Sequence, residues 1–347
     1  MNRPIRHWLL CLLLTVPTVG RADYLAAPKI EDPPPPTDQW QINFYAENDS
    51  RIFKPNSPAD RHYTNGIGLS FARRGGAASE WADDFPGAEA FGPARVASGF
   101  VLGQLMFTPE DISTTALVPD DRPYAGYLFL GLFFQRARER TLEHYQMELG
   151  VVGPLSFAED AQKWVHDGTG APDPVGWDNQ LGDEVTFQTH YRRKWRSDPP
   201  RPDQAFQTQW VPQVAAALGT VHRFIEGGVL WRAGQNLPDD FGPGHLQDVA
   251  SATGDPVEGF GWSVFAHGAV RLVEHNMFLE GNNFKESHGV RPEPILGLLR
   301  AGFALRHLAF NSQVEFGYSQ TFMTKEFKGQ NDGHAYGGIF LSILHRF

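Results

Sequence analysis

The chain has 347 residues, with 40 acidic and 30 basic side chains and a formal net charge of −10. This excess of negative charge argues against nucleic acid as a partner, because nucleic-acid binding needs a basic surface. The mean hydropathy is −0.35, and beyond the N-terminal segment no apolar run reaches the roughly 20 residues of a membrane-spanning helix. The sequence therefore excludes a helical membrane protein.

The N-terminal segment, residues 1–22, has the layout of a secretory signal peptide. Arg3 and Arg6 precede an apolar stretch, and small residues follow it. Cleavage would remove three arginines, giving a formal charge of −13, and would also remove Cys11, the only cysteine. An exported protein without cysteines must be held together by its own hydrogen bonding. Residues 23–38, with four consecutive prolines, predict an extended leader.

From residue 39 onward, apolar and polar residues alternate with the two-residue period of a β-strand. The clearest runs are QINFYAE at 41–47 and QVEFGYSQTF at 313–322. In the run that begins near residue 335 the alternation is imperfect, because Phe340 and Leu344 fall on the otherwise polar side. Alternation of this kind is expected where one face of each strand meets hydrocarbon, and only a closed barrel satisfies every backbone group there.

The number and spacing of these runs predict an all-β fold, a transmembrane antiparallel β-barrel over residues 39–347 in the cell outer membrane. We count about twelve strands, an even number as in single-chain outer-membrane barrels. They begin near residues 41, 64, 98, 124, 142, 183, 206, 221, 260, 295, 309 and 335.

The segments between the strands divide into short and long connections. Short links near 138–141 and 307–309 are predicted to be periplasmic turns. The outward loops are predicted at 49–63, 107–123, 152–182, 276–294 and 323–334. Two further segments, 74–97 and 234–259, are too long for turns and are interpreted as periplasmic excursions.

Polar residues gather where the first outward loop begins. Glu47, Asn48 and Asp49 stand at its start and Asp60 near its end. Loops on a rigid scaffold are where sites tend to be built, and these oxygens suit a hard cation such as calcium. The alternative is turn chemistry, since Asn and Asp favour strand ends for local reasons.

A short helix is predicted in the third outward loop. Ser156 followed by Glu159 has the spacing of a capping box. Along such a helix Ala158, Gln162 and His166 recur every fourth residue and share one face. A histidine beside a glutamine could orient and deprotonate a water, whereas a solvated loop histidine would have no such role.

Two other groups at the loop ends allow alternative interpretations. His62 and Thr64 are two residues apart, on one face of a regular strand, which is a layout for a nucleophile and its base or simply a strand end. Arg122 beside Asp121 could close the second loop through an ion pair. Its guanidinium could instead bind a lipid phosphate.

Taken together, the segments resemble the lipid A 3′-O-deacylase family of Gram-negative outer membranes. The matching pieces extend from the first strand to about residue 284. In chain order they are ENDS at 47–50, DRHYTNG at 60–66, GQLMFTPEDI at 103–112, DRPYAGYLF at 121–129, ELGVVGP at 148–154, Gln162 with His166, GWDNQLGDE at 176–184 and NMFLEGNNF at 276–284.

The resemblance implies a twelve-stranded barrel whose site lies between its wall and a helix of the third loop. The implied activity is calcium-dependent hydrolysis of the ester that holds the 3′ acyl chains of lipid A, the membrane anchor of lipopolysaccharide. By similarity, His166 matches the general base and Gln162 the site residue four positions before it. Asn48 and Asp49 match the calcium-site pair, and Thr64 matches a site threonine. Bound Ca²⁺ would polarise the ester carbonyl.

The chain departs from the family pattern at two positions. A lysine of the second loop has no counterpart in 112–121, and no glutamate follows the histidine in 167–172. These differences imply a differently decorated lipid A, or loss of activity.

Other functions stay open on the sequence alone. An outer-membrane phospholipase or a His/Thr-type lipid A esterase would also act on outer-membrane lipid. A porin-like barrel would have no enzymatic activity. The sequence indicates no obligate protein partner.

Overall fold

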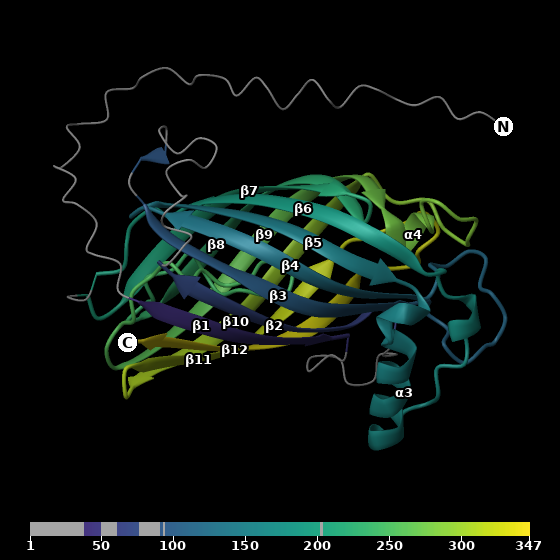
Figure 1. Cartoon of the computed structure of the whole chain (residues 1–347), viewed down its shortest axis with the longest axis horizontal. Helices are drawn as coiled ribbons and strands as arrows, with labels where there is room; N and C mark the ends of the chain where they lie inside the picture. The colour runs from purple at the N-terminus through teal and green to yellow at the C-terminus, as the bar shows by residue number, and fades with distance from the viewer. Residues whose placement is uncertain (1–37, 50–60, 76–90, 93, 202–203) are drawn as a thin grey trace, which may run out of the picture. The chain divides into compact units, whose positions relative to one another are not determined.

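The computed structural model describes residues 38–49, 61–75, 91–92, 94–201 and 204–347. Twelve antiparallel strands form a closed barrel in which neighbours along the chain are neighbours in the wall, and β1 pairs with β12 to close it (Figure 1). The predicted fold class and strand number are confirmed. No helix among these residues is long and apolar enough to cross a membrane. The predicted signal peptide and leader up to residue 37 lie outside the described residues.

The strand positions agree with the sequence pattern to within a few residues. The strands are β1 Gln39–Asn48, β2 His62–Arg74, β3 Arg95–Thr108, β4 Ala125–Ala137, β5 Thr141–Val152, β6 Glu184–Trp195, β7 Gln207–Gly219, β8 His222–Gln235, β9 Phe260–Asn276, β10 Ile295–Ala309, β11 Ser312–Met323 and β12 His334–Arg346. Strand β11 begins later than predicted because the turn before it lies at Phe310 and Asn311, which have φ of 50° and 59°.

Within the described residues, four short helical segments of three or more residues lie in the connections. They are η1 Pro154–Ser156, α3 Ala158–Thr169, η2 Trp177–Asn179 and α4 Met277–Glu280.

The outward faces of the strands form an apolar band around the barrel. Over much of the barrel wall, alternate strand residues are exposed or half-buried, and their neighbours point into the lumen and are buried. Exposed members of the band include Ile67, Leu69, Phe100, Leu102, Leu130, Leu132, Met147, Leu149, Phe187, Leu218, Val264, Leu305, Val314 and Leu341. Such a surface is unfavourable in water and matches the hydrocarbon of a bilayer.

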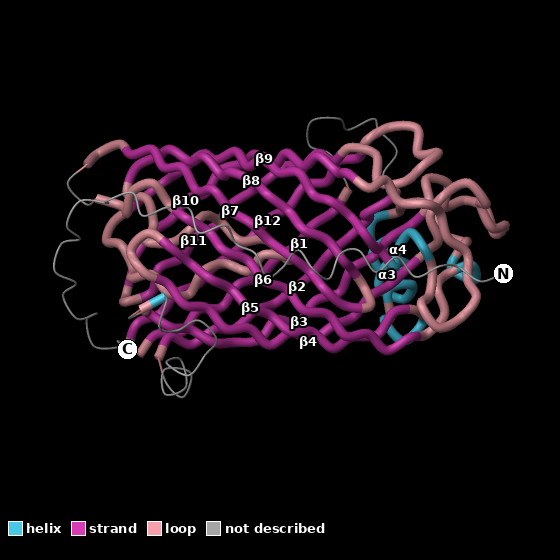
Figure 2. The backbone as a smooth tube through the Cα atoms, turned by 90° about the horizontal axis from the view of Figure 1, so that it is seen from above, coloured by secondary structure: helices cyan, strands magenta, loops and turns pink. Residues whose placement is uncertain are grey.

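The lumen is filled by the long segment between β8 and β9, residues 236–259, which we call the plug. Its apolar side chains Leu237, Phe241, Leu246 and Val249 are at most 3% exposed. Figure 2 shows loop segments between the strands of the barrel. The interpretation of 234–259 as a periplasmic excursion is therefore wrong. In the other long segment, residues 76–90 and 93 lie outside the described part of the chain.

Hydrogen bonds fix the plug to β1 along much of that strand. The Gln39 side chain donates to the carbonyl oxygens of Ala252 and Gly254 at 3.2 and 2.8 Å. Further along, the Leu246 N–H donates to the Glu47 carboxylate at 3.2 Å. The imperfect alternation of the last strand fits a packed lumen, because the lumen-facing Phe340 belongs to the same core cluster as the plug side chains and Leu344 is 7% exposed.

Charge pairing holds the middle of the plug against β6. Asp248 lies 2.8 Å from the Lys194 ammonium and 3.2 Å from the Arg192 guanidinium, and all three side chains are buried. Two cations thus share one carboxylate inside the barrel. Arg192 has a second carboxylate partner in Glu226 at 3.6 Å.

Replacing Asp248 by alanine is expected to destabilise the barrel by about 3–5 kcal/mol, because both cations would stay buried without this partner. Urea unfolding of the protein in lipid vesicles measures the change. The matched control is Asp332→Ala, which removes an exposed carboxylate and should leave the unfolding midpoint unchanged. Equal midpoints for both variants would contradict the role assigned to Asp248.

Candidate active site on the outer face of the barrel

The antiparallel order of the first five strands brings the predicted site residues to one end of the barrel. The end of β1 pairs with β2 through Asn48 and Asn65, and the start of β2 pairs with the end of β3 through His62 and Thr108. The third outward loop leaves β5 at that same end. Figure 1 shows α3 at the end of the barrel where β3 and β5 finish.

A row of residues on β3 shows which side of the wall carries the site. Gln104, Met106 and Thr108 alternate with Leu105 and Phe107, which face the lumen and belong to the main core. Gln104, Met106 and Thr108 therefore lie on the lipid-facing side of the wall. Without a cover, the glutamine and the threonine would contact lipid there.

The third loop covers this outward row. The Gln104 amide donates to the Ser156 carbonyl oxygen at 2.7 Å. Met106 packs in one cluster with Tyr124, Ala158 and Trp177. Helix α3 thus lies against the outside of the wall, and a polar strip is enclosed between them.

The start of α3 differs from the capping box predicted from the sequence. A short 3-10 turn precedes the helix, and the Ser156 hydroxyl donates to the Gly153 carbonyl within that turn at 2.6 Å. Phe157, with φ of 57°, is the N-cap residue, and no side chain caps the helix. The Glu159 carboxylate instead accepts a hydrogen bond from Lys163 on the exposed face, and this bond raises the pKa of the amine.

The shared face of the helix is as predicted. Its buried residues are Ala158, Gln162 and His166. Because they are four residues apart, their side chains lie on the same helix face, the one that contacts the wall. On the opposite side Trp164 is 77% exposed. The solvated-histidine interpretation therefore does not hold for His166, which is 4% exposed.

Hydrogen bonds orient both polar side chains of that face. His166 Nδ1 lies 2.6 Å from the Pro172 carbonyl oxygen, which can only accept, so Nδ1 carries the proton. A neutral imidazole then has its lone pair on Nε2. Gln162 Oε1 accepts the indole N–H of Trp177 at 2.8 Å, which fixes the NH₂ group at the other end of the amide.

Replacing Trp177 by phenylalanine is expected to lower kcat/KM about tenfold, because the Gln162 amide loses one orienting hydrogen bond of about 1–1.5 kcal/mol. The buried ring packing against Tyr124, at 5.0 Å between centroids, would largely persist. Initial rates of acyl-chain release measure the change. Trp164→Phe is the control, since that side chain is exposed on the same loop. A wild-type rate for Trp177→Phe would remove the orienting role.

Oxygen-bearing residues of β1, β2 and β3 continue the strip toward the loop ends. Thr64 Oγ1 lies 2.7 Å from Thr108 Oγ1, and both residues are fully buried. The Asn48 amide donates to the Thr64 carbonyl oxygen at 3.2 Å. Asp49 is 3% exposed, and its carboxylate accepts the Arg61 N–H at 2.6 Å.

A β-bulge separates His62 from Thr64, so the prediction that they share one face is wrong. The register between β2 and β3 shifts at Thr64, and His62 has φ of 64°. The His62 ring lies 5.8 Å from Phe327 and 5.6 Å from His334, measured between centroids. Thr64 instead contacts β3. The bulge therefore removes the geometry that a His/Thr nucleophilic pair would need.

Arg122 is buried on the lumen side of the second loop. Its guanidinium pairs with Glu326 at 3.2 Å and lies over the Phe107 ring at 5.1 Å. The predicted ion pair with Asp121 is wrong, because the Asp121 carboxylate accepts backbone N–H groups instead. Arg122 thus joins the second outward loop to the loop before β12. Its binding of a lipid phosphate stays a prediction, against which its 1% exposure weighs.

The donor atoms at the β1 end fit a calcium ion in kind. Among the described residues no three His, Cys, Asp or Glu side chains cluster as a metal site. Calcium, however, takes carboxylate, amide and backbone oxygens together, and Asp49 with Asn48 offers both side-chain types. Asp60, the other acidic residue noted in this loop, lies outside the described part of the chain.

Several residues that build the site were not assigned a role from the sequence. Trp177 orients Gln162, Gln104 holds the loop before α3, and Thr108 is the partner of Thr64. A signal was present for two of these, because Gln104 and Thr108 stand at lipid-facing positions where polar residues require a cover. The Trp177 contact depends on the path of the loop, which has no periodic pattern.

Comparison with known proteins agrees with this architecture. The family described as outer membrane protein LpxR matches residues 8–345. LpxR from Salmonella typhimurium superposes with a TM-score of 0.69 at 20% identity, covering 88% of this chain and 100% of that one. The β-domain of the Bordetella autotransporter BrkA has 8% identity and a TM-score of 0.42, over 90% and 99% of the two chains. No curated protein matches the chain. The chain therefore belongs to the LpxR family of outer membrane proteins, the lipid A 3′-O-deacylase family.

Proposed function

We propose that this protein hydrolyses the ester bonds that hold the 3′ acyl chains of lipid A. The observation that carries the proposal is the enclosed strip between α3 and the outer face of β3. Its oriented histidine and glutamine lie outside the barrel, at the extracellular end of the lipid-facing surface. An ester between a sugar headgroup and an acyl chain lies at that level of the membrane, and a lipid can approach the strip from the side.

We infer that His166 acts as the general base. Its Nε2 takes a proton from a water, and the resulting hydroxide attacks the ester carbonyl carbon. When the tetrahedral intermediate collapses, the imidazolium returns the proton to the 3′ oxygen of the sugar. The fatty acid is formed as the carboxylic acid and then loses its proton to water, and the Pro172 carbonyl keeps accepting the Nδ1 proton and holds the ring in one orientation throughout.

Gln162 and the oxygen-rich end of the strip would stabilise the developing negative charge. The Gln162 NH₂ group, fixed by the bond from Trp177, is a donor suited to an oxyanion. Asn48 and Asp49 would hold the calcium ion, with Thr64 beside them. When bound, calcium would act as a Lewis acid toward the ester carbonyl.

The alternative functions receive less support from the geometry. The bulge at Thr64 disfavours a His/Thr nucleophile. The plug fills the lumen through buried contacts with β1 and β6, which disfavours a porin-like role.

Expression in a Gram-negative host tests the proposal, with mass spectrometry of lipid A and of phospholipids from the same cells. We expect lipid A to lose its 3′-linked chains while the 3-linked ester chain and the phospholipids stay intact. Lysophospholipid without any change in lipid A would establish a phospholipase instead. Ion conductance in planar bilayers with unchanged lipids would establish a porin.

The departures from the family pattern concern substrate decoration. We propose that the absence of a lysine from 112–121 alters which phosphate decorations of lipid A are accepted. Rates on lipid A preparations with bare and with amine-capped phosphates test this. A clear preference for capped phosphates is expected. The amine of the cap is positively charged, and a site that lacks the lysine repels it less. Equal rates would contradict this effect of the missing lysine.

A further inference from the structure

Two segments of the family resemblance end in residues that have no role in the proposed mechanism. They are GWDNQLGDE at 176–184, at the end of the third outward loop, and NMFLEGNNF at 276–284, at the start of the loop between β9 and β10. The antiparallel strand order brings both loops to one end of the barrel, where Figure 1 shows α3 and α4. Hydrogen bonds join residues 182–184 to residues 282–285, and we call this contact the Glu184 clamp.

The Glu184 carboxylate is the centre of the clamp. Glu184 is the first residue of β6 and is 6% exposed. Its oxygens accept the side-chain amides of Asn283 and Asn282 at 2.8 and 3.1 Å, and the backbone N–H groups of Asn283 and Phe284 at 3.0 and 3.3 Å. Hydrogen bonds to an ionised acceptor are about twice as strong as those between neutral groups. Four donors from one short segment therefore hold a buried negative charge.

A second contact joins the same two loops through Gly182. The Asn282 side chain accepts the Gly182 N–H at 3.0 Å and donates to the Gly182 carbonyl oxygen at 2.8 Å. The backbone at Gly182 thus has the donor and the acceptor that a neighbouring strand would provide. Lys285 adds a hydrogen bond to the Asp183 carbonyl oxygen. Each residue of the segment 182–184 is therefore bound to the β9–β10 loop.

On its other side the segment 182–184 contacts the start of the third outward loop. The Asp183 carboxylate accepts the Leu155 N–H at 2.8 Å, in the turn before α3. Gly153 lies so close that a Cβ atom on it would be 2.6 Å from Asp183 N. The pairing of β5 with β6 ends at Val152 and Glu184, so the sheet itself does not hold this turn. The clamp thus reaches the residues that lead into α3.

The residues just before the clamp contact the candidate active site. The Leu181 N–H donates to the Tyr124 carbonyl oxygen at 2.9 Å, and the Tyr124 ring packs against Trp177. Trp177 in turn donates to the Gln162 amide oxygen. The short limb 177–181 therefore connects the clamp to the side chain that orients Gln162.

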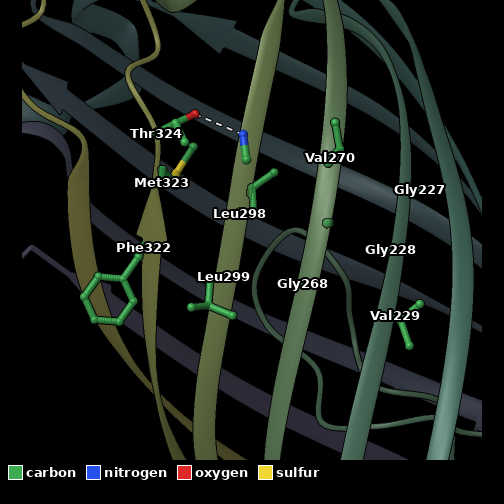
Figure 3. Close-up of a pocket in the computed structure, with 12 residues that line it drawn as sticks. Gly227, Gly228, Val229, Gly268, Val270, Leu298, Leu299, Phe322, Met323 and Thr324 are labelled. Atoms are coloured by element: carbon green, nitrogen blue, oxygen red, sulfur yellow. Dashed lines mark hydrogen bonds between the residues drawn. The ribbon is translucent and has the colours of Figure 1, made fainter.

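The β9–β10 loop can support the clamp because both of its ends are anchored. At its start, the three apolar side chains of α4 are at most 1% exposed, and the Met277 N–H donates to the Val221 carbonyl oxygen at 2.9 Å. At its end, where β10 begins, the Gly297 N–H donates to the Thr324 hydroxyl at 2.9 Å, as Figure 3 shows. Movement of this loop would break contacts on several strands, so it can hold the third outward loop in one place.

We propose that Glu184 is a positioning residue for acyl-chain release, through which the β9–β10 loop sets the place of the third outward loop against the barrel wall. The inference rests on the proposed deacylase function. Glu184 itself does not contact substrate; it acts through Asp183 on the start of α3, and through the limb 177–181 on Gln162. Without the clamp, Gln162 and His166 would shift relative to the oxygen-rich end of the strip, and misplacement by about 1 Å can lower the rate about 100-fold.

Distance measurement by pulsed electron paramagnetic resonance tests the clamp without any substrate. The only cysteine lies at position 11, within the predicted signal peptide, so two introduced cysteines can be labelled selectively. Spin labels on Trp164→Cys, on the exposed face of α3, and on Glu139→Cys, in the exposed β4–β5 turn, report where α3 lies relative to the barrel. The same variants without labels are assayed for acyl-chain release, to give kcat and KM separately.

The test variant is Glu184→Gln, which keeps the size of the side chain and removes its charge. Glu286→Gln is the matched control, because it makes the same change at an exposed position of the β9–β10 loop. Asn282→Ala removes the contact with Gly182 and tests the clamp from its other side, should Glu184→Gln fail to form a closed barrel.

We expect a narrow distance distribution for the wild type and Glu286→Gln, and a clearly broader one for Glu184→Gln. In closed barrels that resist unfolding in detergent, Glu184→Gln should lower kcat about 10–100-fold and leave KM within about twofold, because the loss falls on the transition state. A merely structural role of Glu184 would lower the fraction of closed barrels and leave kcat per closed barrel unchanged.

Unchanged distances and kcat in both clamp variants would overturn the proposal. Broad distances with the wild-type kcat would overturn it as well, because the reaction would then not need a fixed third loop. A rise in KM alone would overturn the positioning role in favour of substrate contact. If the wild type released no acyl chains, the proposed function would fail, and the distances would still decide whether the clamp holds α3 in place.

Discussion

Replacing His166 by alanine is expected to lower the rate of 3′ acyl-chain release by about 10²–10⁴-fold, the range for loss of a positioned general base. The imidazole is buried against the wall and held through Nδ1 by the Pro172 carbonyl, so no neighbouring side chain of α3 can replace it. Mass spectrometry of purified lipid A after timed incubation with the purified protein measures the rate.

The control for this prediction lies three residues away on the same helix. Lys163→Ala removes an exposed pair with Glu159, which contributes little to stability at a surface. It should keep the wild-type rate. If His166→Ala also kept that rate, the general-base role would be lost, and with it the assignment of chemistry to α3.

The second large effect is expected at Asp49. Chelation of divalent cations should abolish acyl-chain release, and added calcium should restore it in the wild type. Asp49→Asn keeps an oxygen that can accept the Arg61 N–H but loses the negative charge. We expect an activity loss of at least about 100-fold at moderate calcium, because Lewis-acid stabilisation contributes several kcal/mol.

A matched carboxylate separates the metal site from general surface charge. Asp111→Asn changes an exposed residue of the second loop, whose partner is Ser113, and should have no effect. Full activity of the wild type in excess chelator would rule out calcium and leave Asp49 with a structural role. Activity of Asp49→Asn that recovers at high calcium would support weakened metal binding.

The barrel could be predicted from the sequence because its physical cause is local. Each lipid-facing position must be apolar, so runs such as 41–47 and 313–322 carry a two-residue period wherever they occur. The plug has no such period. Leu246 hydrogen-bonds to a residue of β1 about 200 residues earlier in the chain, and Ala252 to a residue of β4 about 120 residues earlier. The sequence of a loop does not indicate where its apolar residues pack. The local sign of a packed lumen in the sequence was that Phe340 and Leu344 are apolar residues on the lumen side of the last strand.

The candidate site was predictable where motifs or helical spacing marked it. The four-residue spacing of Gln162 and His166 correctly placed both on the buried face of α3. Elsewhere, predictions from residue spacing were wrong because the backbone is irregular. One extra residue at Thr64 separates it from His62, and the turn before α3 takes Ser156 out of the cap position. Neither feature follows from residue type alone, because each is imposed by the packing of a loop on the wall.

The central claim is that the reaction depends on α3 lying against the outside of the wall. Gly126 of β4 allows this contact, since a Cβ atom there would lie 2.1 Å from Ser156 Oγ and 2.3 Å from Ala158 Cβ. Gly126→Val should therefore push the helix outward without altering any residue proposed to bind substrate or metal. Gly168→Ala, in open space near the end of α3, is the control.

The decisive measurement is the rate of 3′ acyl-chain release by these two variants, with barrel closure checked by resistance to unfolding in detergent. We predict a closed barrel with at least about a 100-fold loss for Gly126→Val, because misplacing catalytic groups by about 1 Å can cost that much. Gly168→Ala should match the wild type. Unimpaired release by a closed Gly126→Val barrel would contradict the placement of the active site between α3 and the wall.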